Sequence, residues 1–269
     1  MRGMTGMLLM GVPLGSSGGG FSPDSLEGLG LWIDAAHAAS LFQDSAGTTP
    51  ASANGDPLGR VGRLPANYAW MDVTANKPSL ILNQLNGRPV IRFGNNDWFW
   101  LTNLSLLKNV ASYTYFAVLK YSNTTGIRTE LFYSVGTGAV SSRFSSNMAD
   151  ATHLLGISGR RLDTDSLGLM RNADADFNFM IKEAVVSHAT ATASVTKNGT
   201  VVVSGAYLTT GSTSNTDSQR ATVGAATDPI GQFFGGDLAE MLLYVPALTD
   251  EQRLSVRQYL SDKWGIALS

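Results

Sequence analysis

The chain of 269 residues contains no cysteine, only three histidines and few charged residues. The absence of cysteine excludes disulfide bonds and thiolate chemistry, so the fold must be stable without covalent cross-links. The three histidines are His37, His153 and His188, which are far apart in the sequence. Charged residues make up 15% of the chain, and the formal net charge is −2. This balance predicts no binding of nucleic acid and no electrostatic attraction to anionic membranes.

Hydrophobic residues make up 43% of the chain, and the remainder is rich in serine, threonine, glycine and asparagine. Short β-branched and aromatic segments alternate with turn signals, among which Asn198-Gly199 marks the clearest two-residue hairpin. Residues 40–67 have little periodicity and are predicted to form long surface loops. The spacing of the short segments predicts a β-sandwich or a β-barrel.

The strongest local pattern is found in residues 233–266, and it begins with a strand. Residues 238–245 are apolar on both faces of this strand except at Glu240. A strand of this kind is normally central in its sheet and covered on both sides. Pro246 ends the strand because proline has no N–H to pair with a neighbouring strand.

A short helix is predicted directly after this strand. Thr249 and Gln252 have the spacing of a capping box, which begins a helix, and Gly265 is suited to its end. An apolar stripe at helical spacing indicates the side that packs on the rest of the protein. That stripe consists of Val256, Tyr259, Leu260 and Trp264.

This C-terminal stretch resembles the end of concanavalin A-like lectin/glucanase (LamG-like) jelly rolls, which occur in phage and bacterial surface proteins. Residues 29–35 and 87–93 resemble the start of such domains, so the similarity covers residues 26–266. It implies an all-β jelly-roll β-sandwich over residues 21–269 with a short C-terminal α-helix. This fold hosts lectins, glycanases and structural modules, so the resemblance does not select one function. The C-terminal residues that carry the match are Phe234, Gly236, Ala239, Glu240, Tyr244, Leu248, Arg253, Tyr259, Leu260, Lys263, Trp264 and Gly265.

Residues 1–20 are predicted to form an extended arm that ends in a glycine-rich hinge. Its apolar run is too short to span a bilayer and lacks the cleavage site of a secretory signal. Such a segment buries too little surface to fold alone, and methionine adapts well to irregular partner surfaces. We therefore expect the arm to dock on another protein chain. Its apolar docking residues are Met4, Met7, Leu8, Leu9, Met10, Val12 and Leu14.

No active site is recognisable in the sequence. Glycan cleavage requires two carboxylates on either side of the scissile bond. Glucanases of the family that this chain resembles usually carry them on one strand as Glu-x-Asp-x-x-Glu, and no glutamate here begins that pattern. Glu240 is the best single candidate, and we expect it to be a structural acid bonded to backbone or arginine. The protein is therefore predicted not to be an enzyme.

Two aspartate pairs, Asp163-x-Asp165 and Asp174-x-Asp176, are candidates for a calcium site. In a strand, both carboxylates of such a pair would lie on one side and could share a cation. Ca²⁺ needs six to eight oxygen ligands, so a pair of carboxylates is only the beginning of a site. The competing interpretation, which we favour, is that these are solvated acids in turns.

The densest aromatic cluster contains Trp98 and Trp100 and follows Asn96 and Asp97. In an extended segment the two tryptophans would face one way and Phe99 the other. Exposed indoles beside Asn96 and Asp97 would form a platform on which a sugar could stack. Packing of the indoles in the core or against another subunit is the favoured interpretation, because tryptophan is mostly buried in proteins.

Three functions fit these observations, and the first is a structural protein of a bacteriophage virion. It would be a capsid decoration, head fibre or tail component, docked on other virion proteins through its arm and forming a homo-oligomer. The second function is a carbohydrate-binding module that recognises a host glycan. The third and least favoured is a glycan-cleaving enzyme.

Overall fold

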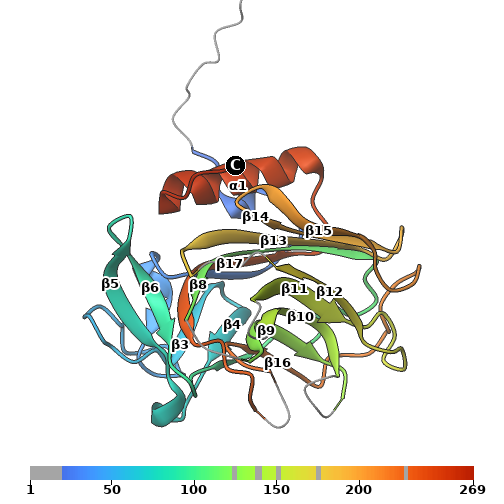
Figure 1. Ribbon diagram of the computed structural model, residues 1–269. Coiled ribbons are helices and arrows are strands. Elements are labelled where there is room, and N and C mark those ends of the chain that lie inside the picture. The colour runs from blue at the N-terminus through green and yellow to red at the C-terminus, as the bar shows by residue number, and fades with distance from the viewer. Residues whose placement is uncertain (1–19, 123–125, 137–140, 150–152, 174–176, 227–229) are drawn as a thin grey trace, which may run out of the picture.

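The computed structural model describes residues 20–122, 126–136, 141–149, 153–173, 177–226 and 230–269. Two antiparallel sheets lie face to face, and a single α-helix covers the outer side of one of them (Figure 1). The predicted fold class, an all-β jelly-roll sandwich with a short C-terminal helix, is confirmed. The predicted docking residues of the arm lie outside the described residues. No helix in the described part is long and apolar enough to cross a membrane.

The first sheet has eight strands in the order β15-β14-β13-β8-β17-β6-β5, with β1 paired to β17 as well. Strand β17 is central because β8 pairs along one edge while β6 and β1 share the other. Its position agrees with the apolar sequence of both its faces. The strands of this sheet are β1 (Leu29–Asp34), β5 (Ser79–Leu85), β6 (Arg88–Phe93), β8 (Ser112–Tyr121), β13 (Met180–Ser187), β14 (Thr192–Lys197), β15 (Thr200–Ala206) and β17 (Gly236–Tyr244).

The second sheet has nine strands in the order β12-β11-β10-β9-β16-β7-β4-β3-β2. Its strands are β2 (Leu41–Phe42), β3 (Arg60–Leu64), β4 (Asn67–Trp70), β7 (Phe99–Leu101), β9 (Arg128–Ser134), β10 (Ser142–Ala149), β11 (Leu154–Gly159), β12 (Gly168–Ala173) and β16 (Arg220–Val223). Three short 3₁₀ helices, η1 (Pro23–Ser25), η2 (Ala38–Ser40) and η3 (Thr74–Asn76), lie in the connections.

The prediction that residues 40–67 form only loops is wrong. Strands β2 and β3 lie in this stretch and extend the nine-stranded sheet beyond β4. Strand β2 has two residues and is at the edge of the sheet, where only one side of a strand needs a partner. Strand β3 pairs on both sides, but its register with β4 shifts between Val61 and Leu64, so neither strand shows a sustained alternation in its sequence.

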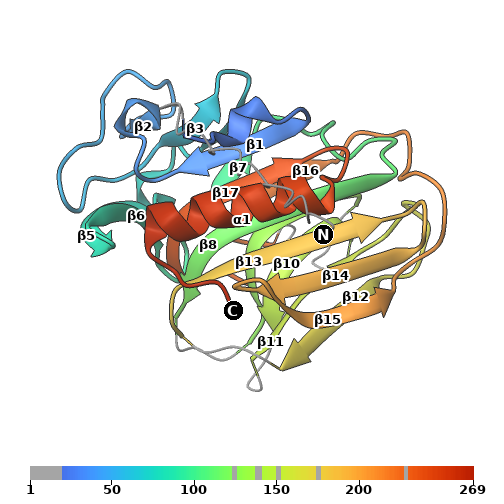
Figure 2. The same cartoon turned by 90° about the horizontal axis from the view of Figure 1, so that it is seen from above.

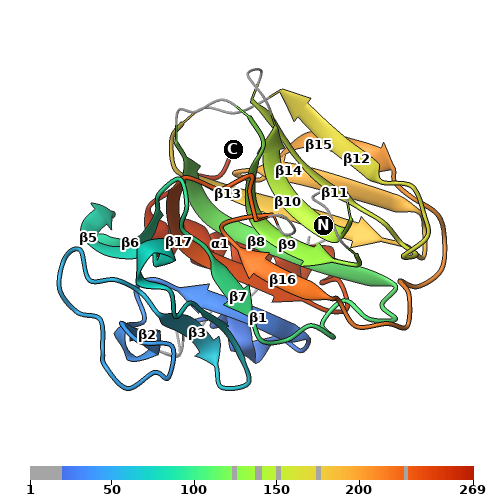
Figure 3. The ribbon, with the colours of Figure 1, turned by 90° about the horizontal axis from the view of Figure 1, so that it is seen from below.

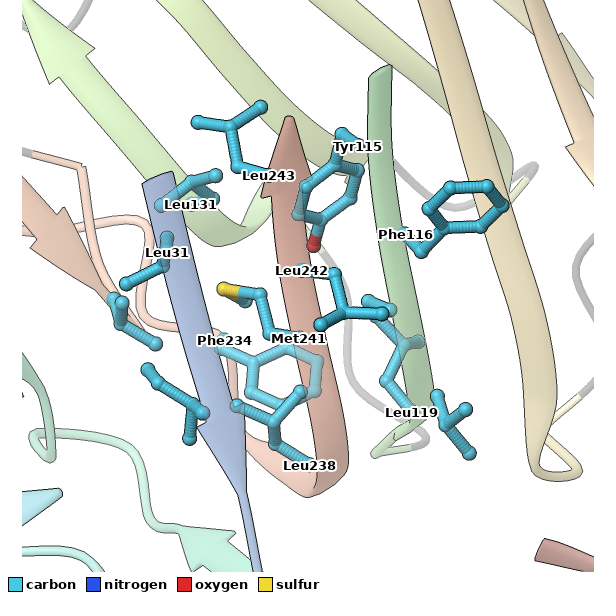
Figure 4. Packing of buried hydrophobic residues seen from close by; sticks show 14 of the residues in the cluster. Leu31, Tyr115, Phe116, Leu119, Leu131, Phe234, Leu238, Met241, Leu242 and Leu243 are labelled. Atoms are coloured by element: carbon cyan, nitrogen blue, oxygen red, sulfur yellow. The ribbon is translucent and has the colours of Figure 1, made fainter. Parts of the chain in front are cut away.

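The core fills the space between the two sheets (Figure 4). Met241 and Leu243 of β17 point into it together with Leu31 of the neighbouring strand β1. Tyr115 of β8 and Leu131 of β9 meet them there, and all of these side chains are buried. Since β9 belongs to the opposite sheet, these contacts join the two layers of the sandwich.

Helix α1 (Asp250–Trp264) lies across the outer surface of the eight-stranded sheet (Figure 2). The predicted capping box is present, with Thr249 accepting from the Gln252 N–H and the Gln252 side chain accepting from the Thr249 N–H. Gly265 ends the helix at a φ of 68°, in the left-handed region that glycine adopts without strain. The predicted apolar stripe is confirmed, since Val256, Leu260 and Trp264 are buried and Tyr259 is half-buried.

Candidate functional site

The strands of the nine-stranded sheet lie side by side (Figure 3), and their register aligns a row of outward-facing residues. Phe144 on β10 and Ile157 on β11 point into the core, so Ser145 and Ser158, each one position away, point outward. Starting at edge strand β12, the outward-facing residues on successive strands are Leu169, Ser158, Ser145, Phe132, Thr222, Trp100 and Trp70. The row combines small hydroxyl side chains with aromatic ones on a single face.

A cavity of about 210 Å³ opens on this face over strands β10, β11 and β12. Its volume is below the roughly 300–1,000 Å³ of pockets for drug-sized ligands, so it admits only a small group or a single ring. Its polar lining residues are Ser145, Asn147, Ser158, Arg171 and Gln232. Its apolar lining residues are Ile127, Leu167 and Leu169.

Asn147 is the central polar group of the cavity. Its Nδ2 donates to Ser145 Oγ at 3.0 Å and to Ser158 Oγ at 3.3 Å. Its Oδ1 has no hydrogen-bond partner, although the residue is only 1% exposed. An acceptor that is buried without a partner costs about 1–3 kcal/mol of stability. A ligand that brings an N–H or O–H to Asn147 Oδ1 would remove this cost.

The backbone of Asn147 is held from inside the sandwich by a buried ion pair. Lys182 Nζ donates to the backbone oxygen of Asn147 at 3.0 Å and to Glu130 Oε1 at 2.6 Å. Tyr121 donates to the other oxygen of Glu130 at 3.0 Å. Burial lowers the pKa of Lys182, and the Glu130 carboxylate opposes this shift. Because Lys182 and Tyr121 belong to the opposite sheet, the cavity floor is fixed to both layers.

Asp163, one of the predicted calcium ligands, is already paired in the structure. Its Oδ1 accepts from the buried Arg143 guanidinium at 2.7 Å, and its Oδ2 accepts from Thr216 Oγ1 at 2.6 Å. Burial would raise the pKa of Asp163, but the hydrogen bonds from Thr216 and Arg143 outweigh it and lower the pKa. The guanidinium neutralises this carboxylate, which disfavours a cation there.

The other predicted calcium ligands do not complete a site in the described part of the chain. Asp165 Oδ2 accepts from the backbone N–H of Leu162 at 3.0 Å and so caps a turn. Asp174 and Asp176 lie outside the described residues. Among the residues that the structure describes, no group of three or more histidines, aspartates and glutamates is placed to hold a metal. Binding of calcium stays a prediction.

The structure brings Trp98 and Trp100 into edge-to-face contact, with ring centroids 4.3 Å apart and planes at 90°. Trp98 is only 8% exposed and packs on the core cluster, whereas Trp100 is half-buried on the outer face. As predicted, Phe99 points the other way, and it contacts Phe93 of the opposite sheet. Two parallel exposed indoles are therefore not formed, and only Trp100 is placed for stacking.

The polar neighbours of these tryptophans hold the turn that precedes them. Asn96 Nδ2 donates to the backbone oxygen of Ala75 at 2.8 Å, and Asp97 Oδ2 accepts from the Gly94 N–H at 2.7 Å. Burial raises the pKa of Asp97, and the Gly94 hydrogen bond opposes this shift. Both side chains are thus engaged in local structure, and their predicted contact with a sugar stays a prediction.

Glu240, the best single candidate for a catalytic carboxylate, is fully buried. Its Oε1 accepts from Trp32 Nε1 at 2.8 Å and from the Tyr259 hydroxyl at 3.0 Å. Its Oε2 accepts from Trp264 Nε1 and from Lys263 Nζ, each at 2.7 Å. Burial raises the pKa of this carboxyl. Glu240 is a structural acid as predicted, but the predicted backbone or arginine partners are wrong.

A larger groove of about 870 Å³ lies along α1 beside Phe21. Its polar side chains are paired within the protein, since Gln258 donates to Asp262 at 2.8 Å and Lys263 donates to Glu240 at 2.7 Å. No buried polar side-chain atom of its described lining residues lacks a hydrogen-bond partner. We therefore place the candidate site at the Asn147 cavity.

Sequence reasoning missed this cavity. The available signal is the run Ser145-Ser146-Asn147, which interrupts an otherwise ordinary strand between Phe144 and Met148. Small polar residues at buried strand positions indicate that the strand is shielded from solvent by groups that are not purely apolar.

The chain matches no family model and no curated protein sequence. Among solved structures it is similar to the CBM40 module of the Ruminococcus gnavus IT-sialidase bound to α2,3-sialyllactose. That similarity has a TM-score of 0.48 and a sequence identity of 16%, and it covers 57% of this chain and 85% of that one. It is also similar to the leech intramolecular trans-sialidase, with a TM-score of 0.48 and 16% identity over 61% of this chain and 24% of that one. The heptameric SAP-like pentraxin of Limulus polyphemus gives a TM-score of 0.43 and 14% identity over 55% of this chain and 70% of that one. Each of these similarities concerns the path of the backbone.

Proposed function

We propose that this protein is a non-enzymatic carbohydrate-binding β-sandwich and that its site is the Asn147 cavity. The observation that carries the proposal is the unpartnered Oδ1 of Asn147, buried in a cavity that also presents Ser145 and Ser158. Sugars supply many O–H donors together with apolar C–H faces. A small cavity lined by both polar and apolar residues complements both parts of a sugar ring.

Trp100 extends the proposal across the same face. It is three strands away from Ser145 in the outward row, which corresponds to about 14 Å at the spacing of paired strands. Phe132 and Thr222 lie between them and are buried, so the indole and the cavity are separate contact points. A chain of sugars could reach both, with one ring in the cavity and another against Trp100.

The absence of catalysis is part of the proposal. Glu130 is the acidic residue nearest to Asn147 in the described hydrogen-bond network, and it is buried beneath the cavity floor in its pair with Lys182. Among the described lining residues of the cavity there is no carboxylate. Release of reducing sugars by the pure protein from any polysaccharide that it binds would overturn this part of the proposal.

The binding test compares Asn147→Ala with Asn172→Ala. Asn172 is an exposed asparagine of β12 whose Nδ2 donates to the Val202 backbone oxygen, so it is a matched control. The wild-type protein is screened on a glycan array, and the best binders are measured by titration calorimetry. Asn147→Ala should weaken binding at least about tenfold, because one buried hydrogen bond is lost. Equal binding by both variants would exclude the cavity as the site.

A further inference from the structure

The lining of the Asn147 cavity combines an unpaired polar atom with aliphatic side chains, and this combination points to a particular class of sugar. The inference rests on the proposed function, because it specifies the ligand of that same cavity. The Asn147 Oδ1 needs a hydrogen-bond donor. In the same cavity Ile127, Leu167 and Leu169 present aliphatic surface.

Leu169 is the exposed member of the apolar lining. It is 57% exposed and is one of four large hydrophobic side chains that stand out in this way in the described part of the chain. It is the cross-strand neighbour of Ser158, so apolar and polar groups of the cavity lie next to each other. A ligand that covers Leu169 with an apolar group removes this surface from water, which is favourable.

A hydroxyl group satisfies only one of these two requirements. It could donate to Asn147 Oδ1, but it brings no apolar surface to the aliphatic side chains that line the cavity. An acetamido group satisfies both, because it carries an N–H donor and a methyl group at a fixed separation on a planar amide. Its carbonyl oxygen can accept from the Ser145 or Ser158 hydroxyl, each of which is able to donate as well as accept.

We propose that the Asn147 cavity binds the acetamido group of an N-acetylated amino sugar. The small volume of the cavity, about 210 Å³, limits recognition to this one substituent and part of its ring. The rest of the glycan projects out of the cavity. The acetamido group is favoured over a hydroxyl by the apolar surface that its methyl group buries.

The test uses pairs of methyl glycosides that differ only in an acetamido or hydroxyl group at C2, with glucose, galactose and mannose frameworks. Binding is followed by ¹⁵N chemical-shift changes at Asn147, Ser158 and Leu169. In at least one pair the acetamido member should bind about tenfold or more tightly than its hydroxyl partner. Asn147→Ala should weaken binding of both members of a pair, because either member can donate to Oδ1, while Asn172→Ala should leave the binding of both unchanged.

Leu169→Ser provides a second variant that does not disturb a buried residue, since Leu169 is largely exposed. It should weaken binding of the acetamido sugar and leave that of the hydroxyl sugar unchanged. Equal affinity within every pair, lost in Asn147→Ala, would overturn the acetamido assignment and leave the carbohydrate-binding proposal intact. If the protein bound none of these sugars, both the acetamido assignment and the carbohydrate-binding proposal would be overturned. An acetamido preference that persists unchanged in Leu169→Ser would also overturn the inference, because it would place the group elsewhere.

Discussion

Trp264, the last residue of helix α1, donates its indole N–H to the buried carboxylate of Glu240 on the central strand β17 at 2.7 Å. Trp32 of β1 donates to the other oxygen of the same carboxylate at 2.8 Å. The closing helix is thus fixed to the middle of the eight-stranded sheet by a directed polar contact as well as by apolar packing. Lys263 Nζ lies 2.7 Å from Glu240 Oε2, and its positive charge offsets part of the cost of burying this carboxylate.

Truncation of this contact should be costly for stability. Trp264→Ala removes a fully buried aromatic side chain and leaves the Glu240 carboxylate with one donor fewer. We expect the free energy of unfolding to fall by about 3–5 kcal/mol, measured by urea denaturation. Leu254→Ala on the exposed side of the same helix is the control and should change it by less than about 0.5 kcal/mol. Equal effects of the two variants would contradict the described packing of α1.

The buried pair of Lys182 and Glu130 should respond differently to single and double substitution. Lys182→Met leaves the Glu130 carboxylate buried without its countercharge, and we expect a loss of about 3–5 kcal/mol. Adding Glu130→Gln removes the stranded charge and should restore most of the stability. A double-mutant cycle by urea denaturation at neutral pH measures this coupling. Additive losses would show that the two groups do not interact in the folded state.

His188 should make stability depend on pH. It is fully buried, and neither ring nitrogen has a hydrogen-bond partner. Burial and the nearby Arg161 lower its pKa from 6.5 to about 4, against the opposing effect of Asp165. The unfolded chain therefore binds a proton more readily than the folded one. This contribution to stability is present above pH 6.5 and is lost as the pH falls towards 4.

The expected size of this loss is about 3 kcal/mol between pH 7 and pH 4. His188→Leu should keep the stability at pH 7, because the imidazole is neutral there and makes no described hydrogen bond. The same substitution should also reduce the decline in the free energy of unfolding between pH 6.5 and 4, measured by chemical denaturation at each pH. His37→Gln, a change at a half-buried histidine, is the control. An unchanged pH profile in His188→Leu would contradict the low pKa.

The elements that sequence analysis predicted are those whose signals are local. The capping residues Thr249 and Gly265 act within one helical turn of their own positions, so α1 could be placed closely. Alternation of Trp98, Phe99 and Trp100 likewise depends only on strand geometry. The partners of Glu240 could not be predicted, because Trp32 is 208 positions away in the sequence.

The candidate site was hidden for the same reason. Ser145, Ser158 and Leu169 come from three strands, and only the register of the folded sheet aligns them. No single segment carries a motif for the cavity. The unpaired oxygen of Asn147 is a property of its surroundings, which a sequence does not display.

The predicted docking arm can be tested without knowledge of its partner. The described core cluster and the side chains packed against it begin at Phe21, so a chain that starts there keeps these contacts. Its melting temperature should stay within about 2 °C of that of the full chain. We propose that the apolar side chains of residues 1–20 dock on another protein chain, in the first instance a second copy of this one.

The full chain should therefore associate in a concentration-dependent manner in sedimentation velocity, whereas the chain that starts at Phe21 should remain monomeric. A full-length variant with Met7, Leu8, Leu9 and Met10 all changed to serine is the matched control, since it keeps the length of the arm but removes its apolar side chains. It should behave like the truncated chain, because burial of those side chains is what would drive association. If the truncated chain associates as the full chain does, the contact between copies lies on the sandwich and the arm is not an anchor. If it fails to fold, the arm belongs to the core of its own domain, and the interpretation of a virion protein that docks through this segment loses its basis.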